Sequence, residues 1–169
     1  MERFLVDEML LRLGRWMRLL GQDVANPEGA TDSELLQRSK AEQRTLVTRD
    51  KRLAEDCKRA GAKCILVKSS KLEDQLAEMA DQGIAFRLDP RRCTLCNNPL
   101  ESLEGSLTQE SAGESEERVL LERKPLKRAE MESEGRKTWR CTGCGKLYWE
   151  GAHWKRMKEV LETISSCKR

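Results

Sequence analysis

Four cysteines in two Cys-x-x-Cys pairs are the clearest chemical signal in the chain. The pairs are Cys93 with Cys96 and Cys141 with Cys144. A turn of this spacing places two thiolates close enough to share one ion, and two such turns complete a tetrahedral zinc site. A site closed by four sulfurs has no open position for water or substrate. We therefore expect the zinc to be structural.

The residues that follow each pair favour zinc over redox chemistry, which is the competing interpretation of Cys-x-x-Cys. Asn97 and Gly145 come directly after the second cysteine of each pair. Asparagine and glycine tolerate the left-handed backbone that lets N–H groups point at the sulfurs. The amino-terminal MERFLVDE has no signal-peptide pattern, so we expect reduced thiols and a cytoplasmic protein.

Three aspartates form a second candidate metal site. Asp7 and Asp50 directly follow the first and third apolar runs, and Asp32 begins a predicted helix. Ligands of open parallel sheets collect at the carboxyl ends of the strands. If the strand order is 2-1-3-4, Asp7 and Asp50 are neighbours and Asp32 reaches the same space. Converging carboxylates repel one another unless cations neutralise them, and such oxygen ligands suit Mg²⁺ or Mn²⁺.

One or two bound ions at these acids would give the chain hydrolytic chemistry. They would orient a water and stabilise the charge of a phosphodiester, which requires neither histidine nor a nucleophilic side chain. This suits a chain with a single histidine. A structural interpretation also exists, because Asp32 and Asp50 are both placed to stabilise the start of a helix. Asp7 is harder to explain in this way, because an acid after a buried strand needs a partner.

A bacterial receiver domain also places acids after its first and third strands. Asp7-Glu8 would then be the acidic pair and Asp50 the phosphate acceptor. No lysine follows a plausible fifth strand in this short region, and Asp32 would have no role. The sequence therefore disfavours a receiver.

Two groups of basic residues are candidates for contacts with nucleic-acid phosphates. The first group lies on one face of the predicted helix beside the acids, and the second follows the second cysteine pair. A solvated helix face explains the first group equally well, and we expect Trp154 to pack the ribbon on the core. The candidates are Arg12, Arg15, Arg18, His153, Lys155 and Arg156.

The elements that position these residues alternate between strand and helix over residues 1–90. Such alternation predicts an α/β fold with a parallel sheet and crossover helices. The predicted strands are 4–6, 23–25, 45–48 and 64–67, and the predicted helices are 9–20, 31–43, 51–60 and 72–82.

Residues 91–169 have a different character and form the predicted zinc ribbon. A polar insert spans about 101–137, and a final helix runs from about 152 to 164. Residues 139–169 carry 7 Lys and Arg against 3 Asp and Glu, a net charge of +4, whereas residues 1–90 are balanced at 16 against 16. The basic segment fits phosphate contact. No apolar run approaches the length needed to span a membrane.

The motifs together resemble the Mut-seven C-terminal RNase domain family, a PIN-like group. The matching segments are FLVDEMLLRLGRWMRLLG, TDSELL, TLVTRDKRL, SSKLEDQL, CTLCNNPL and WRCTGCGKLYWEGAHWKRM. The resemblance spans nearly the whole chain, and the last segment is its most specific part. It implies a PIN-like domain over residues 1–90 that is fused to a zinc ribbon.

The resemblance further implies a metal-dependent ribonuclease in which Asp7, Asp32 and Asp50 match the acids of the family. The chain departs from the pattern after the fourth strand, where Ser69-Ser70-Lys71 stand in place of acids. Glu73 and Asp74 are weak substitutes for a fourth metal carboxylate.

The implied partner is RNA, and the ribosome or ribosomal RNA is a further candidate, because nucleases that trim ribosomal RNA combine a PIN domain and a zinc ribbon in this order. Such an analogy rests on fold alone. The second hypothesis is a non-catalytic RNA- or ribosome-binding zinc-ribbon protein. A third, a toxin-like PIN nuclease, is disfavoured by the ribbon.

Overall fold

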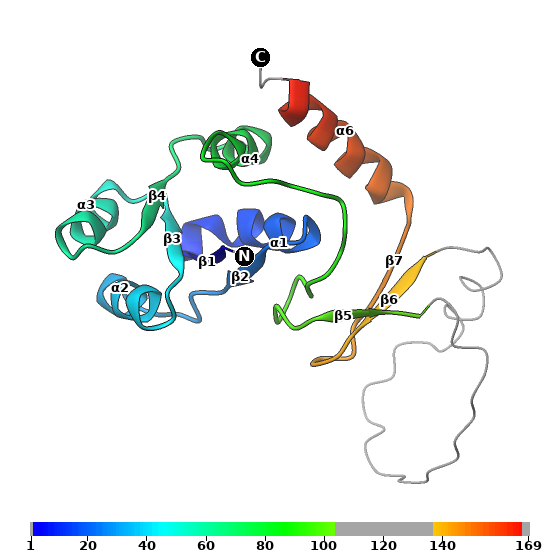
Figure 1. Cartoon of the computed structure of the whole chain (residues 1–169), viewed down its shortest axis with the longest axis horizontal. Helices are drawn as coiled ribbons and strands as arrows, with labels where there is room; N and C mark the ends of the chain where they lie inside the picture. Colours follow the sequence, from blue (N-terminus) through cyan, green and yellow to red (C-terminus); the bar gives the residue numbers. More distant parts are fainter. Residues whose placement is uncertain (1, 104–136, 167–169) are drawn as a thin grey trace, which may run out of the picture.

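A four-stranded parallel sheet forms the centre of the first part of the chain (Figure 1). The computed structural model describes residues 2–103 and 137–166. The strand order is β2-β1-β3-β4, so the condition under which Asp7 and Asp50 follow neighbouring strands, the order 2-1-3-4, is met. The strands are β1 (Arg3–Val6), β2 (Asp23–Ala25), β3 (Thr45–Thr48) and β4 (Cys64–Leu66).

A helix follows each strand and returns the chain to the end of the sheet where the parallel strands begin. The clearest local signal is a capping box, in which the Thr31 side chain accepts from Glu34 N and Glu34 accepts from Thr31 N. In the described part of the chain, no helix is long and apolar enough to cross a bilayer. The helices are α1 (Leu11–Leu19), preceded by a short 3₁₀ turn η1 (Glu8–Leu10), α2 (Asp32–Ala41), α3 (Lys51–Arg59) and α4 (Leu72–Asp81).

Apolar side chains pack on both faces of the sheet, in two separate clusters. Phe4 and Val6 belong to the cluster that includes residues of α1 and α4. Leu5 belongs to the other, with Leu35 of α2 and Leu53 of α3. The alternation along β1 follows from the two-residue period of a strand. Because both faces are covered, consecutive residues such as Phe4, Leu5 and Val6 are all apolar and buried.

The second part of the chain contains a three-stranded antiparallel sheet with the order β5-β6-β7. Its strands are β5 (Leu100–Ser102), β6 (Thr138–Cys141) and β7 (Leu147–Trp149). The four predicted zinc ligands lie in and beside this sheet, so the ribbon and the α/β fold are as predicted. Most of the predicted polar insert, residues 104–136, lies outside the described residues.

The last helix, α6 (Ala152–Ser166), leaves the ribbon and packs on α4 (Figure 1). Met157, Val160 and Ile164 are buried in the same apolar cluster as Phe4 and Val6. The carboxyl-terminal helix thus completes the apolar cluster on one face of the parallel sheet, although its sequence position follows the ribbon.

The ring of Trp154 stacks on Trp139, with centroids 5.4 Å apart and an angle of 8° between the planes. Its Nε1 donates to the carbonyl of Trp149 at 3.1 Å. Trp154 therefore packs α6 on the ribbon.

Candidate functional site

The four cysteine sulfurs form one compact cluster, with all ligand atoms within 4.8 Å of one another. The Sγ atoms of Cys93 and Cys144 are 3.6 Å apart, and those of Cys96 and Cys141 are 3.4 Å apart. Four sulfurs at about 2.3 Å from a shared zinc ion would be about 3.8 Å apart. The donor set and its spacing therefore fit zinc.

Backbone geometry around the cluster follows the expectation from the sequence. Asn97 and Gly145 have φ angles of 61° and 71°, in the left-handed region. Gly143 N and Cys144 N each point at Cys141 Sγ from 3.4 Å. These N–H groups stabilise the thiolate form that binds metal.

Three residues of the zinc site carried no recognisable signal in the sequence. Asn98 donates through Nδ2 to Cys96 Sγ at 3.3 Å. A Cβ at Gly143 would lie 2.3 Å from Asn98 Nδ2, so a larger residue there would displace the Asn98 side chain from Cys96. The Tyr148 hydroxyl accepts from Thr94 N at 3.0 Å and lies 3.1 Å from Cys93 Sγ.

Arg18 connects the first cysteine pair to the α/β domain and is fully buried. Its guanidinium donates to Val24 O at 2.6 Å, Asn26 Oδ1 at 2.6 Å and Thr94 O at 2.8 Å. The prediction of an exposed, phosphate-binding Arg18 is therefore wrong. Arg12, Arg15 and Arg18 are three residues apart, and each step of three falls about 60° short of a full helical turn. Arg18 therefore lies about 120° around the helix from Arg12.

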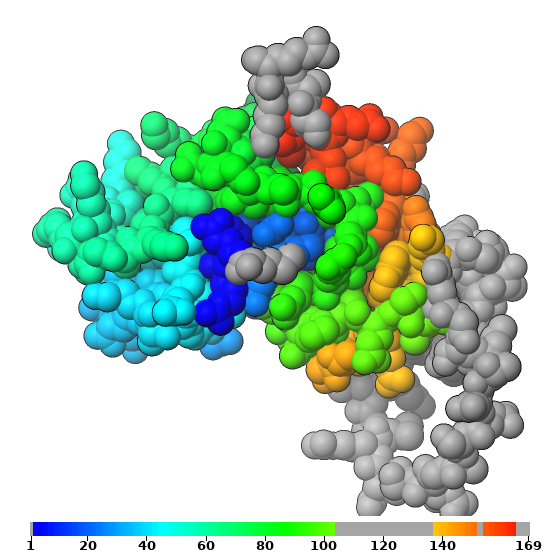
Figure 2. Space-filling model, in the orientation of Figure 1, coloured from blue at the N-terminus to red at the C-terminus, as the bar shows by residue number. Residues whose placement is uncertain are grey.

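A second set of polar contacts fixes the same junction, where the ribbon segments sit directly against the first domain (Figure 2). Asn97 donates to Asp23 Oδ1 at 2.7 Å and accepts from Val24 N at 3.2 Å. Arg44 and Arg92 pair with Asp23 at 2.8 Å and 3.5 Å. Burial works against ionisation, but Arg44 and Asn97 hold the pKa of Asp23 below its usual range. The carboxylate is therefore ionised and committed to the junction.

Asp7 lies where the prediction placed it, directly after β1 at the carboxyl edge of the sheet. The residue is 6% exposed. Its Oδ2 accepts from the Thr48 hydroxyl and, at 3.3 Å, from Arg49 N. Its Oδ1 is buried without a hydrogen-bond partner among the described residues. Burial raises the pKa of Asp7 despite these hydrogen bonds. One oxygen is thus oriented and the other is uncommitted, which fits a cation ligand.

Asp50 is the N-cap residue of α3 and follows Thr48 by two residues. Its Oδ1 accepts from Arg52 N at 2.7 Å and Leu53 N at 3.3 Å, so its helix-capping role is real. Asp50 N donates to Thr48 Oγ1 at 2.9 Å. The Thr48 hydroxyl, buried and missed by the sequence analysis, therefore holds the segments that carry both acids.

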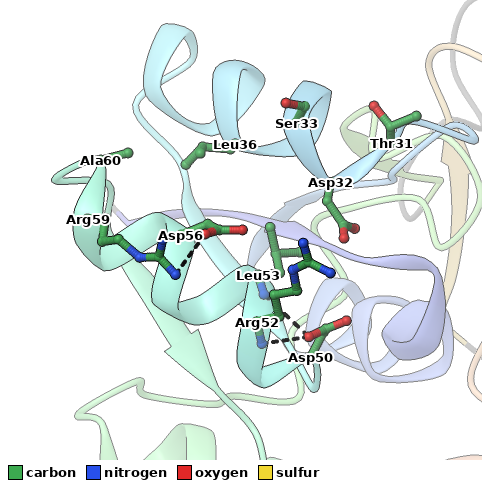
Figure 3. A pocket seen from close by; sticks show the side chains of 10 residues that line it. All are labelled: Thr31, Asp32, Ser33, Leu36, Asp50, Arg52, Leu53, Asp56, Arg59 and Ala60. Carbon is green, nitrogen blue, oxygen red and sulfur yellow. Dashed lines mark hydrogen bonds and ion pairs between the residues drawn. The ribbon is translucent and has the colours of Figure 1, made fainter.

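Asp32 and Asp50 line one open hollow of about 810 Å³ between α2 and α3. Figure 3 shows the Asp32 carboxylate pointing from the start of α2 toward Arg52 and Asp50. Asp7 does not line this hollow. Within the described ranges, the cysteines form the only group of three or more ligating side chains within 4.8 Å, so the three acids stand further apart. Metal binding by them remains a prediction.

The other predicted phosphate contacts occupy two separate surfaces. Arg12 and Arg15 are exposed on α1, as expected, and Lys155 and Arg156 are exposed on α6. Arg156 also lies 3.9 Å from Glu73, a residue considered as a substitute metal ligand. The backbone of His153 belongs to α6, and its side chain lies outside the described part of the structure. Contacts of all these residues with RNA remain predictions.

Comparison with known proteins identifies one family. The model of the family described as the Mut7-C RNAse domain matches residues 2–161, which is nearly the whole chain. The match includes the three acids and both cysteine pairs. No curated protein and no solved structure matches the chain.

Proposed function

The chain belongs to the Mut7-C RNAse domain family, and on this premise we propose that it is a metal-dependent ribonuclease that hydrolyses RNA phosphodiester bonds. Membership supports a nuclease-like, RNA-related function. The metal dependence is our proposal, and it rests above all on Asp7. A buried carboxylate with one oxygen unpartnered is costly to maintain unless a cation binds it.

The proposed Mg²⁺ or Mn²⁺ ligands are Asp7, Asp50 and Asp32. Asp7 offers Oδ1, and Asp50 offers Oδ2, which accepts no hydrogen bond from the described residues. Asp32 is exposed at the rim of the hollow. When bound, such an ion activates water and stabilises negative charge on the phosphodiester.

The remaining residues of the proposed site orient these carboxylates and the RNA. The Thr48 hydroxyl and Arg49 N fix the orientation of Asp7, and the first turn of α3 fixes that of Asp50. Arg52 lies beside Asp32 and Asp50 (Figure 3). Its charge attracts RNA phosphates to an edge that would otherwise repel them. We also propose phosphate contacts for Arg12, Arg15, His153, Lys155 and Arg156.

Zinc in the ribbon has a structural role in this proposal. The four sulfurs close the coordination shell, so the ion cannot bind substrate. None of the six described cysteines forms a disulfide, and we propose a cytoplasmic location, where thiols stay reduced.

The second candidate function is RNA or ribosome binding without turnover. The separation of the three acids favours it, because they do not share one ion-sized space in this structure. The two candidates differ in whether the chain cleaves the RNA that it binds.

A cleavage assay with labelled single-stranded RNA and Mn²⁺ separates the two functions. We expect cleavage by the wild type and its loss in Asp7→Asn, with the exposed Asp81→Asn as a matched control that keeps activity. Cleavage that survives in Asp7→Asn would refute the proposed site. Tight RNA binding without cleavage in either Mn²⁺ or Mg²⁺ would support the binding module.

A further inference from the structure

Two side-chain atoms in the described residues are buried without any hydrogen-bond partner, Asp7 Oδ1 and Arg49 Nε. Buried polar atoms in folded proteins are almost always paired, and exceptions often mark functional positions. One atom belongs to an acid and the other to a base. Their needs are therefore opposite, a cation for Asp7 and an anion for Arg49.

The two atoms belong to residues that meet at one edge of the sheet. Arg49 directly follows β3, and its backbone N donates to Asp7 Oδ2 at 3.3 Å. β1 and β3 are adjacent, with Val6 opposite Val47. Arg49 thus stands in the segment between Thr48 and Asp50, at the carboxyl end of the strands, where open sheets bind ligands.

The side chain of Arg49 differs from the other partly or fully buried arginines of this domain. Arg18 donates to backbone carbonyls and Asn26, Arg38 pairs with Glu42, and Arg44 pairs with Asp23. In the described part of the chain, the Arg49 guanidinium has no hydrogen bond or ion pair. It does not pair with Asp7, which leaves that carboxylate available to a cation.

We propose that Arg49 binds the phosphate of the RNA at the cleavage site, beside the cation that Asp7 holds. This inference rests on the proposed function and adds a substrate contact to it. A phosphate oxygen accepts N–H bonds from a guanidinium, and the same phosphate is attracted to a cation on Asp7. One ligand would then satisfy both unpartnered groups.

The other basic residues nearby lack the feature that identifies Arg49. Lys51, Arg52 and Lys68 are exposed, so water satisfies their donors. Arg49 is half-buried, and its Nε is shielded from solvent. Its position is therefore better explained by a ligand than by solvation.

The test compares the full chain with Arg49→Gln, Arg49→Lys and the control Arg3→Gln. Arg3 is exposed at the amino end of β1, so it lies at the end of the sheet opposite to Arg49. Affinity for single-stranded RNA is measured in Ca²⁺, and kcat and KM are measured in Mn²⁺. We expect Arg49→Gln to weaken RNA binding about tenfold or more and to lower kcat. Arg49→Lys should recover part of the binding, and Arg3→Gln should match the wild type.

Thermal unfolding of each variant identifies any folding defect, and Arg49→Lys keeps the test valid if Arg49→Gln does not fold. The proposal for Arg49 is overturned if a folded Arg49→Gln has the RNA affinity and kinetics of the wild type. In that case, the proposed function still stands if the wild type cleaves RNA and Asp7→Asn does not. If the wild type binds RNA but does not cleave it, the nuclease function fails. The Ca²⁺ binding data would then still decide the role of Arg49.

Discussion

Replacing Asp7 by asparagine should stabilise the protein at neutral pH in the absence of Mn²⁺ and Mg²⁺, and it should abolish catalysis. Asp7 is 6% exposed, and only one of its two oxygens accepts hydrogen bonds. Asparagine has nearly the same shape, and its Oδ1 can accept the hydrogen bonds from Thr48 and Arg49 N. The substitution removes a buried charge and leaves the packing unchanged.

The sign of the effect follows from the direction of the pKa shift. Burial raises the pKa of Asp7 above the ordinary value of 3.8 for an aspartate side chain. A raised pKa in the folded state means that the stabilising contribution is complete below the unfolded pKa and is lost as the pH rises through the folded pKa. At neutral pH, the ionised carboxylate therefore destabilises the metal-free fold. Protonation at low pH removes the difference between wild type and Asp7→Asn.

The free energy of unfolding of Asp7→Asn should exceed that of the wild type by about 1 kcal/mol. A buried, half-satisfied polar group costs about 1–3 kcal/mol, and the asparagine amide stays partly unsatisfied. For a chain of 169 residues, this corresponds to a rise in Tm of about 2–4 °C.

The assay is thermal unfolding of the zinc-loaded protein at pH 7, with and without Mn²⁺. Added Mn²⁺ should raise the Tm of the wild type and leave that of Asp7→Asn unchanged. The control is Asp89→Asn, which removes a surface ion pair with Arg91 and should change little. Lower stability of Asp7→Asn than of the wild type at pH 7 without Mn²⁺, or equal stabilisation of both by Mn²⁺, would refute the reasoning.

Three further predictions concern the junction, the ribbon and the last helix. Arg18→Met should lower the free energy of unfolding by about 3 kcal/mol, because it leaves the Val24 and Thr94 carbonyls without their donor; denaturant titration measures this, and the exposed Arg15→Met should have almost no effect. Cys141→Ser should reduce the zinc content from about one ion per chain to nearly none, as measured by elemental analysis, and full zinc retention would contradict the four-thiolate site. Met157→Ala should cost about 2–5 kcal/mol if α6 belongs to the core of the first domain, and a cost below about 0.5 kcal/mol in denaturant titration would show that the helix is peripheral.

The sheet and the zinc ligands could be predicted because their signals are local. An apolar run such as Phe4 to Val6 must be buried, and the acid that follows it marks the end of the strand. The Cys-x-x-Cys spacing is itself the geometry of a metal turn. These features need no knowledge of distant contacts, so the structure reproduces them.

The features that the sequence did not reveal depend on residues distant in the chain. The buried guanidinium of Arg18 donates to the carbonyl of Thr94, and nothing near Arg18 in the sequence indicates this contact. Thr48 reaches Asp7 only because β1 and β3 pair, and these strands are about forty residues apart in the sequence. The last helix could be predicted from its own sequence, but its packing on α4 could not. Periodicity identifies a face to be buried and does not identify what buries it.

The place of α6 in the core has a consequence for the synthesis of the protein. The three acids are all made before residue 51, whereas Met157, Val160 and Ile164, which complete the first apolar cluster, are made more than a hundred residues later. Until then, the emerging chain exposes the apolar surface that these side chains cover, and domains fold as units. We therefore expect a ribosome-bound chain that lacks α6 to be open to proteolysis. The cleavage site would then become fixed only after the ribbon and α6 have emerged.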